Sequence, residues 1–313
     1  VIFISLSLSF VLAEYLLTKN NEYPRYNQFY YKINNITYGF NDDPKNYFND
    51  ENQEKIIFLG DSYTEGRFCA ANKKDFVNVV KSQMGEYCKS GIYNFASMAL
   101  GPADFLNIYN HFKQENLKKV IVVLNYNDIA INLRDCMVFK ELSNKKYYPE
   151  VKMCKSILET KKDRFSGSLI KTIDNFLERT KTWKFVRSKL YAFPFLRKYY
   201  GSSTIEDFYQ NQQSVEFITY LDVLKKMQID AEKNEIVINF VYFPDVIYLR
   251  EDNDKLWKSF IDVAKTKGVT IKDAWEYFLQ NKNSDNMSRS LTDYHPNCKA
   301  NEIMANFITE KIL

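Results

Sequence analysis

Short apolar runs alternate with longer stretches of mixed apolar and polar residues along most of the chain. The apolar runs predict five strands, over residues 56–61, 92–99, 120–128, 236–245 and 269–275. The stretches between and after them predict helices over residues 74–86, 103–118, 213–233, 253–267 and 299–312. Continuous apolar strands are typical of a parallel sheet that is buried on both faces. The pattern therefore favours an open α/β fold, with helices on both sides of the sheet.

The chain opens on an apolar segment that differs from everything after it. Residues 1–17 are apolar or small apart from serines and Glu14. Such a run approaches the roughly 20 apolar residues that span a bilayer, and it has no clear small-x-small cleavage site. We expect residues 1–18 to form a membrane anchor, truncated at its start because no initiator methionine precedes it. A buried core helix and a cleaved signal peptide are the alternatives.

Two further segments fall outside the alternation of strands and helices. Residues 19–54 are polar and predict a linker and surface loop, so the α/β domain is expected over residues 55–313. Residues 130–212 form an insertion that is longer than a strand crossover needs. Basic and aromatic residues are mixed within it, which suits either a lid or surface-seeking amphipathic helix, or a helical insertion packed on the domain.

Composition and charge narrow the classes of function. The formal charge of +4 over 313 residues gives no reason to expect a nucleic-acid partner, which usually requires a strongly basic surface. The five cysteines include no C-x-x-C pair and no cluster with histidine, so no metal site is expected. In an oxidising compartment, the disulfide pairs considered first are Cys69 with Cys88 and Cys136 with Cys154.

The first predicted strand ends on chemically active residues, in the stretch IIFLGDSYTEG. Ser62 stands where that strand meets a turn, and α/β proteins place their sites at the carboxyl ends of such strands. Gly, Asp and Ser are also ordinary turn residues, so this stretch alone does not separate a nucleophile from a plain turn. A serine nucleophile needs a base, and the chain contains two histidines.

The two histidines differ in their surroundings. His111 lies within a predicted helix, where a packing role is favoured. His295 lies in LTDYHPN, between the fifth strand and the last helix, and is the candidate base. Asp293, two residues earlier, would orient the imidazole ring and stabilise its charged form. The alternative for this stretch is a turn and helix start, with Pro296 near the first helical position.

Two more strands end in residues that suit a site. In NFASMALGPADF the second strand ends in small residues and Gly101, which allow close approach of the backbone. In VVLNYNDI the third strand ends on Asn127 and Asp128, and an asparagine there can donate a hydrogen bond to a developing oxyanion. Because the carboxyl ends of parallel strands share one edge, these residues are expected to meet Ser62 and His295.

These four stretches, in this order, resemble the four sequence blocks of the SGNH (GDSL-type) hydrolases. The resemblance covers residues 55 to 312, with the insertion set aside. It implies a three-layer α/β/α sandwich around a five-stranded parallel, flavodoxin-like sheet, and a serine esterase with a Ser-His-Asp triad. It also implies an oxyanion hole built from the serine amide, a second-block amide and an asparagine side chain.

On that resemblance, Ser62 is the nucleophile, His295 the base and Asp293 its orienting partner. The implied oxyanion donors are the amides of Ser62 and Ala99 and the side chain of Asn127. The chain departs from the family pattern in the second block, where Ala99 takes the place of the usual glycine. Asn125 likewise stands where glycine is frequent, and the aspartate of the last block is two residues before the histidine instead of three.

The combined expectation is a membrane-anchored serine esterase that cleaves carboxylic esters through an acyl-enzyme. O-acetyl groups on carbohydrate are the leading substrate, and by analogy with anchored members of the family the domain is expected outside the cytoplasm. Two alternatives stay open: an O-acyltransferase that acts on a glycan with the same site, and a non-catalytic glycan-binding or scaffold protein with a vestigial triad. No cofactor is expected, because Asp61 and Glu65 in the first loop disfavour a flavin phosphate.

Overall fold

The centre of the fold is a sheet of five parallel strands that follow the predicted apolar runs. In a computed structural model of the chain they are β3 (Lys55–Leu59), β4 (Ile92–Asn94), β5 (Leu117–Leu124), β6 (Val237–Tyr242) and β7 (Ile271–Asp273). Their order is β4-β3-β5-β6-β7, and each neighbouring pair is parallel. This is the flavodoxin-like order, so the predicted α/β fold and its parallel sheet are confirmed.

The structure describes most of the chain outside its beginning and its middle. It covers residues 28–49, 53–66, 69, 73–85, 91–125, 128, 133–151, 154, 214–246, 249, 255–281, 287–288 and 295–313. These residues all belong to one compact unit, Arg25–Leu158 with Ile205–Leu313. The insertion predicted over residues 130–212 is therefore described only in its first part, and its expected role as a lid or packed helix lies outside the described residues.

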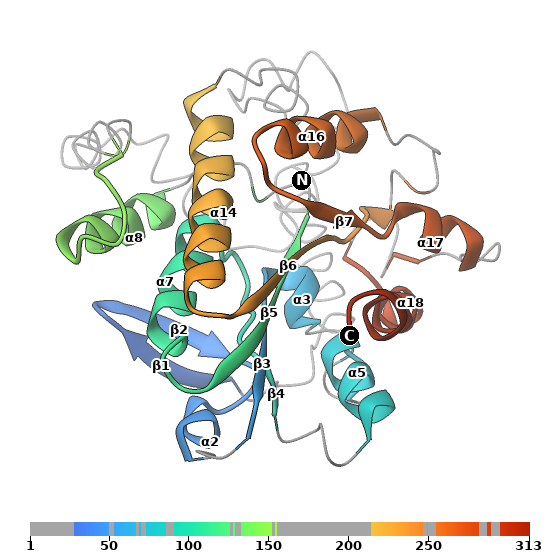
Figure 1. Cartoon of the computed structure of the whole chain (residues 1–313). Helices are drawn as coiled ribbons and strands as arrows, with labels where there is room; N and C mark the ends of the chain where they lie inside the picture. Colours follow the sequence, from blue (N-terminus) through green and yellow to red (C-terminus); the bar gives the residue numbers. More distant parts are fainter. Residues whose placement is uncertain are drawn as a thin grey trace, which may run out of the picture. The chain divides into compact units, whose positions relative to one another are not determined.

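Helices cover both faces of the sheet (Figure 1). On one face lie α7 (Pro102–Phe112) and α14 (Val215–Lys233), and on the other lie α5 (Phe76–Met84) and α18 (Cys298–Lys311). The remaining helices of the sheet region are α8 (Leu133–Asn144), α16 (Lys255–Thr266) and α17 (Trp275–Asn281). Of these seven helices, five follow the helical stretches that the sequence predicts, and α8 and α17 were not predicted. The result is the expected three-layer arrangement.

The apolar side chains of the middle strand, β5, place the sheet in the core. Residues 120–124 of β5, Val-Ile-Val-Val-Leu, are each at most 1% exposed. Burying a side chain of this size stabilises the fold by about 1.5–3 kcal/mol. Neither face of residues 120–124 is left for water, as expected for a parallel strand between two helical layers.

Residues before the sheet take a different form from the one expected. The sequence predicts a polar linker and surface loop over residues 19–54, but within it β1 (Phe29–Ile33) and β2 (Ile36–Phe40) form an antiparallel hairpin. The short helix α2 (Pro44–Asn49) follows. Aromatic side chains anchor this segment, since Phe40 and Tyr47 are fully buried in the core. The aromatic residues of this hairpin are spaced among polar ones, so the average polarity of the segment does not indicate strands.

The expected membrane location is corrected. Within the described residues, no helix is both long and apolar enough to cross a bilayer, so the prediction of a membrane-anchored protein with an extracytoplasmic domain is withdrawn. The predicted anchor itself, residues 1–18, lies outside the described residues.

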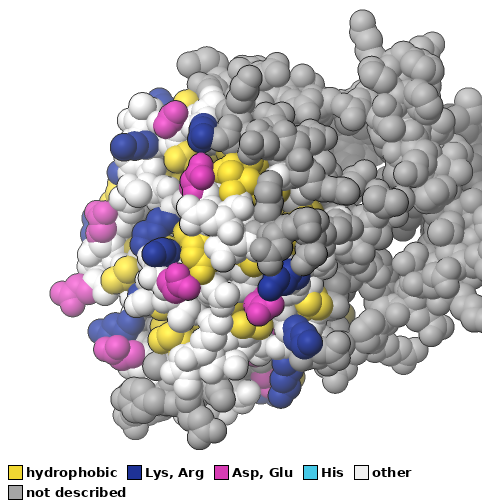
Figure 2. Space-filling model, turned by 90° about the vertical axis from the view of Figure 1, so that its right-hand side faces the viewer, with side chains coloured by type: hydrophobic (Ala, Val, Ile, Leu, Met, Phe, Trp, Pro, Cys, Tyr) yellow, Lys and Arg dark blue, Asp and Glu magenta, His cyan; other side chains and the backbone are white. Residues whose placement is uncertain are grey.

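Charged side chains are mixed on the face of the molecule that Figure 2 presents. Lysine and arginine side chains alternate there with aspartate and glutamate, and apolar side chains occur singly among them. The described residues of this face therefore form no broad patch of a single charge.

Candidate active site

The turn after β3 presents Ser62 at the carboxyl edge of the sheet. β3 ends at Leu59, and the single-turn helix α3 (Ser62–Glu65) begins two residues after Gly60. The Asp61 side chain caps this helix by accepting the N–H of Tyr63 at 2.9 Å. A Cβ on Gly60 would collide with the Thr64 hydroxyl, so only glycine lets α3 pack this closely on the strand end.

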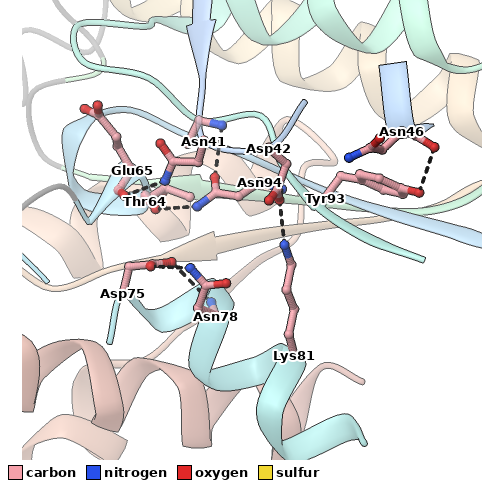
Figure 3. Close-up of polar contacts among 11 residues, drawn as sticks. Asn41, Asp42, Asn46, Thr64, Glu65, Asp75, Asn78, Lys81, Tyr93 and Asn94 are labelled. Carbon is pink, nitrogen blue, oxygen red and sulfur yellow. Dashed lines mark hydrogen bonds and ion pairs between the residues drawn. The ribbon is translucent and has the colours of Figure 1, made fainter. Parts of the chain in front are cut away.

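The end of α3 is held by two asparagine side chains from outside the helix. Asn41, just after β2, donates through Nδ2 to the Glu65 carbonyl at 2.7 Å. Asn94, the last residue of β4, donates through Nδ2 to the Thr64 carbonyl at 3.2 Å (Figure 3). Terminal carbonyls of a helix have no partner within it. The hairpin and β4 thus fix the orientation of the helix that begins at Ser62.

A second group of contacts ties the same N-terminal segment to α5. Asp42 accepts the backbone N–H of Asn94 at 2.6 Å and pairs with Lys81 of α5, also at 2.6 Å (Figure 3). Gln28, just before β1, donates to the buried carboxylate of Glu65 at 2.6 Å. These contacts explain how polar residues of the N-terminal segment find partners beside the core.

Ser62 and His295 are brought together from opposite ends of the domain. Nε2 of His295 lies 3.0 Å from Oγ of Ser62, across 233 residues of sequence. The histidine lies three residues before α18, whose N-cap Asn297 accepts the N–H groups of Lys299 and Ala300 through its side chain. The predicted pairing of these two side chains is what the structure contains, and 3.0 Å is the distance a serine nucleophile and its base require.

The turn after β4 lies beside the Ser62 turn. The N–H of Ser97 donates to the Gly60 carbonyl at 3.3 Å, which extends the pairing of β3 and β4 up to the site. Ala99 follows with φ of +61°, in the left-handed region that favours glycine. Within the described residues the Ala99 N–H donates no hydrogen bond, whereas the Gly101 N–H is bound to the Asp104 carboxylate at 3.2 Å. Ala99 therefore adopts a backbone geometry that is typical of glycine.

A buried carboxyl group lies directly against Ser62. Asp61 is 2% exposed, and its Oδ2 lies 3.3 Å from the Ser62 hydroxyl, which donates to it. Burial raises the pKa of Asp61, while hydrogen bonds from Asn125 and Tyr63 and the nearby His295 oppose that rise. The hydroxyl proton of Ser62 therefore has two acceptors in reach, the Asp61 carboxylate and the imidazole.

A second buried acid lies behind the first. Burial raises the pKa of Asp128 well above its usual range, and the negative charges of Asp61 and Asp135 add to this. The N–H of Asn125, which donates to Asp128 Oδ2 at 2.8 Å, works in the other direction. Asn125 thus contacts both acids.

Two of the predicted site residues lie outside the described residues. These are Asp293, the expected partner of the imidazole, and Asn127, the expected side-chain donor of an oxyanion hole. Both are sequence neighbours of described positions, since Asp293 is two residues before His295 and Asn127 is next to Asp128. Their roles stay predictions.

The other histidine has the packing role that its sequence context favours. His111 Nε2 lies 3.2 Å from the Tyr31 hydroxyl, and the ring packs against Phe48 and Phe112. Burial lowers the pKa of His111. It belongs to α7 and contacts the N-terminal hairpin through Tyr31, with no contact to Ser62 in the described structure.

The described residues contain two disulfides, and the sequence predicted one of them. Cys136 pairs with Cys154, as expected. Cys69 pairs with Cys298, so the expected pair of Cys69 with Cys88 is wrong. Short sequence separation was the reason for the expected pair, but α18 returns to the Ser62 side of the sheet and brings Cys298 next to Cys69.

Several contributors to the site were not found from the sequence. Asp61 and Asn94 lie within the sequence blocks named above. The sequence shows each of them as a polar residue at the end of an apolar strand, which could have indicated a role beside Ser62. Asn41 had no signal, because its segment looked like a polar linker. The Cys69–Cys298 bond depends on the return path of the last helix, which cysteine spacing does not encode.

Comparisons with known proteins bear on the fold. No family model and no curated protein sequence matches the chain. Similar solved structures include a G-D-S-L lipolytic protein from Desulfitobacterium hafniense DCB-2, with 13% identity, a TM-score of 0.38, and coverage of 82% of this chain and 98% of that one. Another, from Veillonella parvula DSM 2008, has 10% identity, a TM-score of 0.42, and coverage of 82% and 97%.

A third similar structure is an acetyl xylan esterase, AlAXEase. It has 11% identity, a TM-score of 0.43, and coverage of 83% of this chain and all of that one. Two of the three are described as G-D-S-L family proteins. At these identities the likeness concerns the fold alone.

Proposed function

We propose that the protein is a serine esterase that cleaves carboxylic esters through an acyl-enzyme. The observation that carries this proposal is the 3.0 Å contact between Ser62 Oγ and His295 Nε2 at the carboxyl edge of the parallel sheet. Nucleophilic acyl transfer requires at least a hydroxyl nucleophile and a general base that can take its proton, and both groups are present at this edge. An intact pair of this kind disfavours the alternative of a non-catalytic scaffold.

The reaction follows from the positions of these two side chains. Ser62 Oγ bonds to the ester carbonyl carbon while its proton passes to Nε2 of His295. The bond from that carbon to the alcohol oxygen then breaks, and the imidazolium gives the same proton to the leaving oxygen. Water attacks the acyl-Ser62 ester by the same route, which releases the carboxylic acid and restores the hydroxyl. Asp293 is proposed to orient the ring, with Asp61 as a second carboxyl group near its positive charge.

The oxyanion that forms on the carbonyl oxygen needs donors already in place. We assign this role to the N–H groups of Ser62 and Ala99 and to the side chain of Asn127. The Ala99 assignment is supported by its left-handed backbone and by its uncommitted N–H. Gly101 is the poorer candidate, because its N–H already caps α7 through Asp104.

The proposed substrates are small O-acyl esters, with O-acetyl groups on carbohydrate as the leading class. This choice rests on the family resemblance of the sequence blocks. Transfer of the acyl group to a sugar hydroxyl would use the same acyl-enzyme, with the sugar in place of water. Acetate released from an acetylated glycan, measured with and without a free sugar acceptor, separates hydrolysis from transfer.

The direct test is to map the residue that reacts with a fluorophosphonate probe. The label should sit on Ser62, and Ser62→Ala should lower turnover of an aryl acetate by about 10⁴-fold or more. Ser143→Ala, at the end of α8, is the matched control and should keep full activity. A label on another residue, or more than a tenth of the turnover left in Ser62→Ala, would remove the proposal.

A further inference from the structure

The Cys69–Cys298 disulfide joins the two loops that carry the reacting side chains. Cys69 lies seven residues after Ser62, and Cys298 lies three residues after His295. The bond therefore closes a loop of 229 residues whose ends are the two halves of the site. Cys136–Cys154, by contrast, closes a loop of 18 residues in which neither end is near Ser62 or His295 in sequence.

On the serine side, backbone hydrogen bonds connect the cysteine to the nucleophile. The N–H of Cys69 donates to the Gly66 carbonyl at 2.8 Å, and the N–H of Gly66 donates to the Ser62 carbonyl at 3.2 Å. Gly66 is in the left-handed region, with φ of +59°, and its place against Asp75 leaves no room for a Cβ. Two consecutive hydrogen bonds thus lead from the buried Cys69 to the residue that bears the hydroxyl.

On the histidine side, the cysteine belongs to the first turn of α18. Cys298 directly follows the N-cap Asn297, whose side chain accepts two N–H groups of that turn. Asn301, one turn further on, is 1% exposed and links the neighbouring segments. Its Nδ2 donates to the Asn297 carbonyl at 2.9 Å, and its Oδ1 accepts the N–H of Phe76 in α5 at 3.2 Å.

We infer that Cys69 and Cys298 are positioning residues for acyl transfer, and that their disulfide, the clamp, sets the separation of Ser62 Oγ and His295 Nε2. This inference rests on the proposed function. Hydrogen bonds connect each cysteine to its half of the site, through Gly66 on the serine side and through Asn297 and Asn301 on the histidine side, so the clamp links two segments that are already hydrogen-bonded. A displacement of about 1 Å between a nucleophile and its base can lower a rate by about 10²-fold.

A test must separate positioning from plain stabilisation, because any disulfide that closes a long loop stabilises a fold. The clamp is removed by Cys69→Ala with Cys298→Ala, and the matched control is Cys136→Ala with Cys154→Ala. The first readout is the rate of fluorophosphonate labelling per folded molecule, with KM measured alongside. We expect labelling and kcat to fall at least about 10-fold in the clamp variant, with KM little changed, and neither to fall in the control.

The second readout does not depend on catalysis. With two histidines in the chain, the imidazole proton resonances of His295 are identified by their loss in His295→Gln. Replacing Ser62 by Ala should shift these resonances when the clamp is present and leave them unchanged when it is absent. If the wild-type protein is not labelled at Ser62, the proposed function is wrong. The resonances of His295 would still show whether the clamp holds the imidazole next to Ser62.

A third arm covers a clamp variant that fails to fold. The control variant keeps the clamp as its disulfide, so a dithiol reductant opens that bond in otherwise folded protein, giving two thiols and the cyclic disulfide of the reagent. Labelling should slow before the circular dichroism signal is lost and should recover on reoxidation. Labelling within about twofold of the oxidised form while the bond is open, or loss of labelling and fold together, would overturn the inference.

Discussion

The two members of the Ser62–His295 pair are held in place by different means. On the serine side, the support is made of hydrogen bonds around α3: Asp61 caps its start, and Asn41 and Asn94 bind its last carbonyls. On the histidine side, the bridge between Ser288 and Pro296 and the disulfide at Cys298 add to the hydrogen bonds of Asn297 and Asn301. The nucleophile therefore follows a strand end directly, whereas the base lies on a segment that a bridge and a disulfide join to the rest of the domain.

This difference explains why one half of the site is easier to recognise than the other. A strand, a glycine, an acid and a serine are consecutive in sequence, so the geometry of the nucleophile is a local property. The base reaches Ser62 only after the chain has completed the sheet, in the segment that leads into α18. Its position is a property of the whole fold. Single substitutions on the two sides should therefore differ in how much they lower turnover and how much they lower stability.

The largest effect is expected from the base itself. His295→Gln keeps a hydrogen-bonding side chain but cannot take the serine proton, so turnover of an aryl acetate should fall by about 10⁴-fold. The thermal midpoint should stay close to that of the wild type, because the ring is only partly buried. His111→Gln serves as the control, and its turnover should stay near the wild-type value. Comparable losses in both variants would mean that His295 has no special place in the reaction.

On the serine side, the loss should be divided between stability and rate. Asn94 is 2% exposed, donates to the Thr64 carbonyl and accepts the N–H of Ala96 at 3.1 Å. Asn94→Ala leaves these buried groups without partners, which should lower the free energy of unfolding by about 1–3 kcal/mol. Turnover per folded molecule should fall as well, by less than in His295→Gln, because α3 keeps its contact with Asn41.

The control for this experiment is the exposed Asn46. Figure 3 shows it near the same network, but its contact to Tyr93 is made by the backbone carbonyl. Asn46→Ala should therefore change the free energy of unfolding by less than about 0.5 kcal/mol. Chemical denaturation with aryl acetate turnover on the same samples gives both numbers. An Asn94→Ala protein as stable as the control would show that α3 needs no external support.

The sequence predicts the sheet, five of its helices and the pair of Ser62 and His295, since each depends on apolar pattern or on a short motif. It does not predict the hairpin of β1 and β2, whose buried Tyr38 and Phe40 alternate with polar residues in a segment of low mean hydropathy. Nor does it predict the partner of Cys69. Contacts such as Asn41 to Glu65 join segments that only the folded chain brings together, so spacing in sequence carries no trace of them.

The buried Asp128 carboxyl group, close to Asp61, is expected to lower the stability of the folded chain at neutral pH. Burial raises the pKa of Asp128 in the folded chain, so the unfolded chain ionises first as the pH rises. The group therefore costs no stability below about pH 4, and the cost grows as the pH rises towards the folded-state pKa. Asp128→Asn keeps the acceptor for Asn125 and should stabilise the protein at pH 7, by about 1.4 kcal/mol for each tenfold difference in acidity between the two states.

The sign of this prediction makes it easy to contradict. Denaturation at pH 7 and at pH 4 should show a gain in unfolding free energy that shrinks at the lower pH. Asp222→Asn on the exposed side of α14 is the control and should change stability by less than about 0.5 kcal/mol at either pH. Asp128→Asn protein that is less stable than wild type at pH 7 would mean that the charge is compensated.

The smallest effect is expected at Ala99, where two opposing terms nearly cancel. A left-handed backbone costs a residue with a Cβ about 1–2 kcal/mol, and Ala99 has φ of +61°. Glycine removes this cost but loses about 0.5–1 kcal/mol through the greater freedom of the unfolded chain. Ala99→Gly should therefore raise the free energy of unfolding by about 0.5–1 kcal/mol. Turnover should hardly change, because the proposed oxyanion donor is the backbone N–H. Ala96→Gly, at a fully buried position without positive φ, should instead destabilise the protein. If both variants lose stability equally, the turn at Ala99 does not have the glycine-like geometry on which the oxyanion assignment depends.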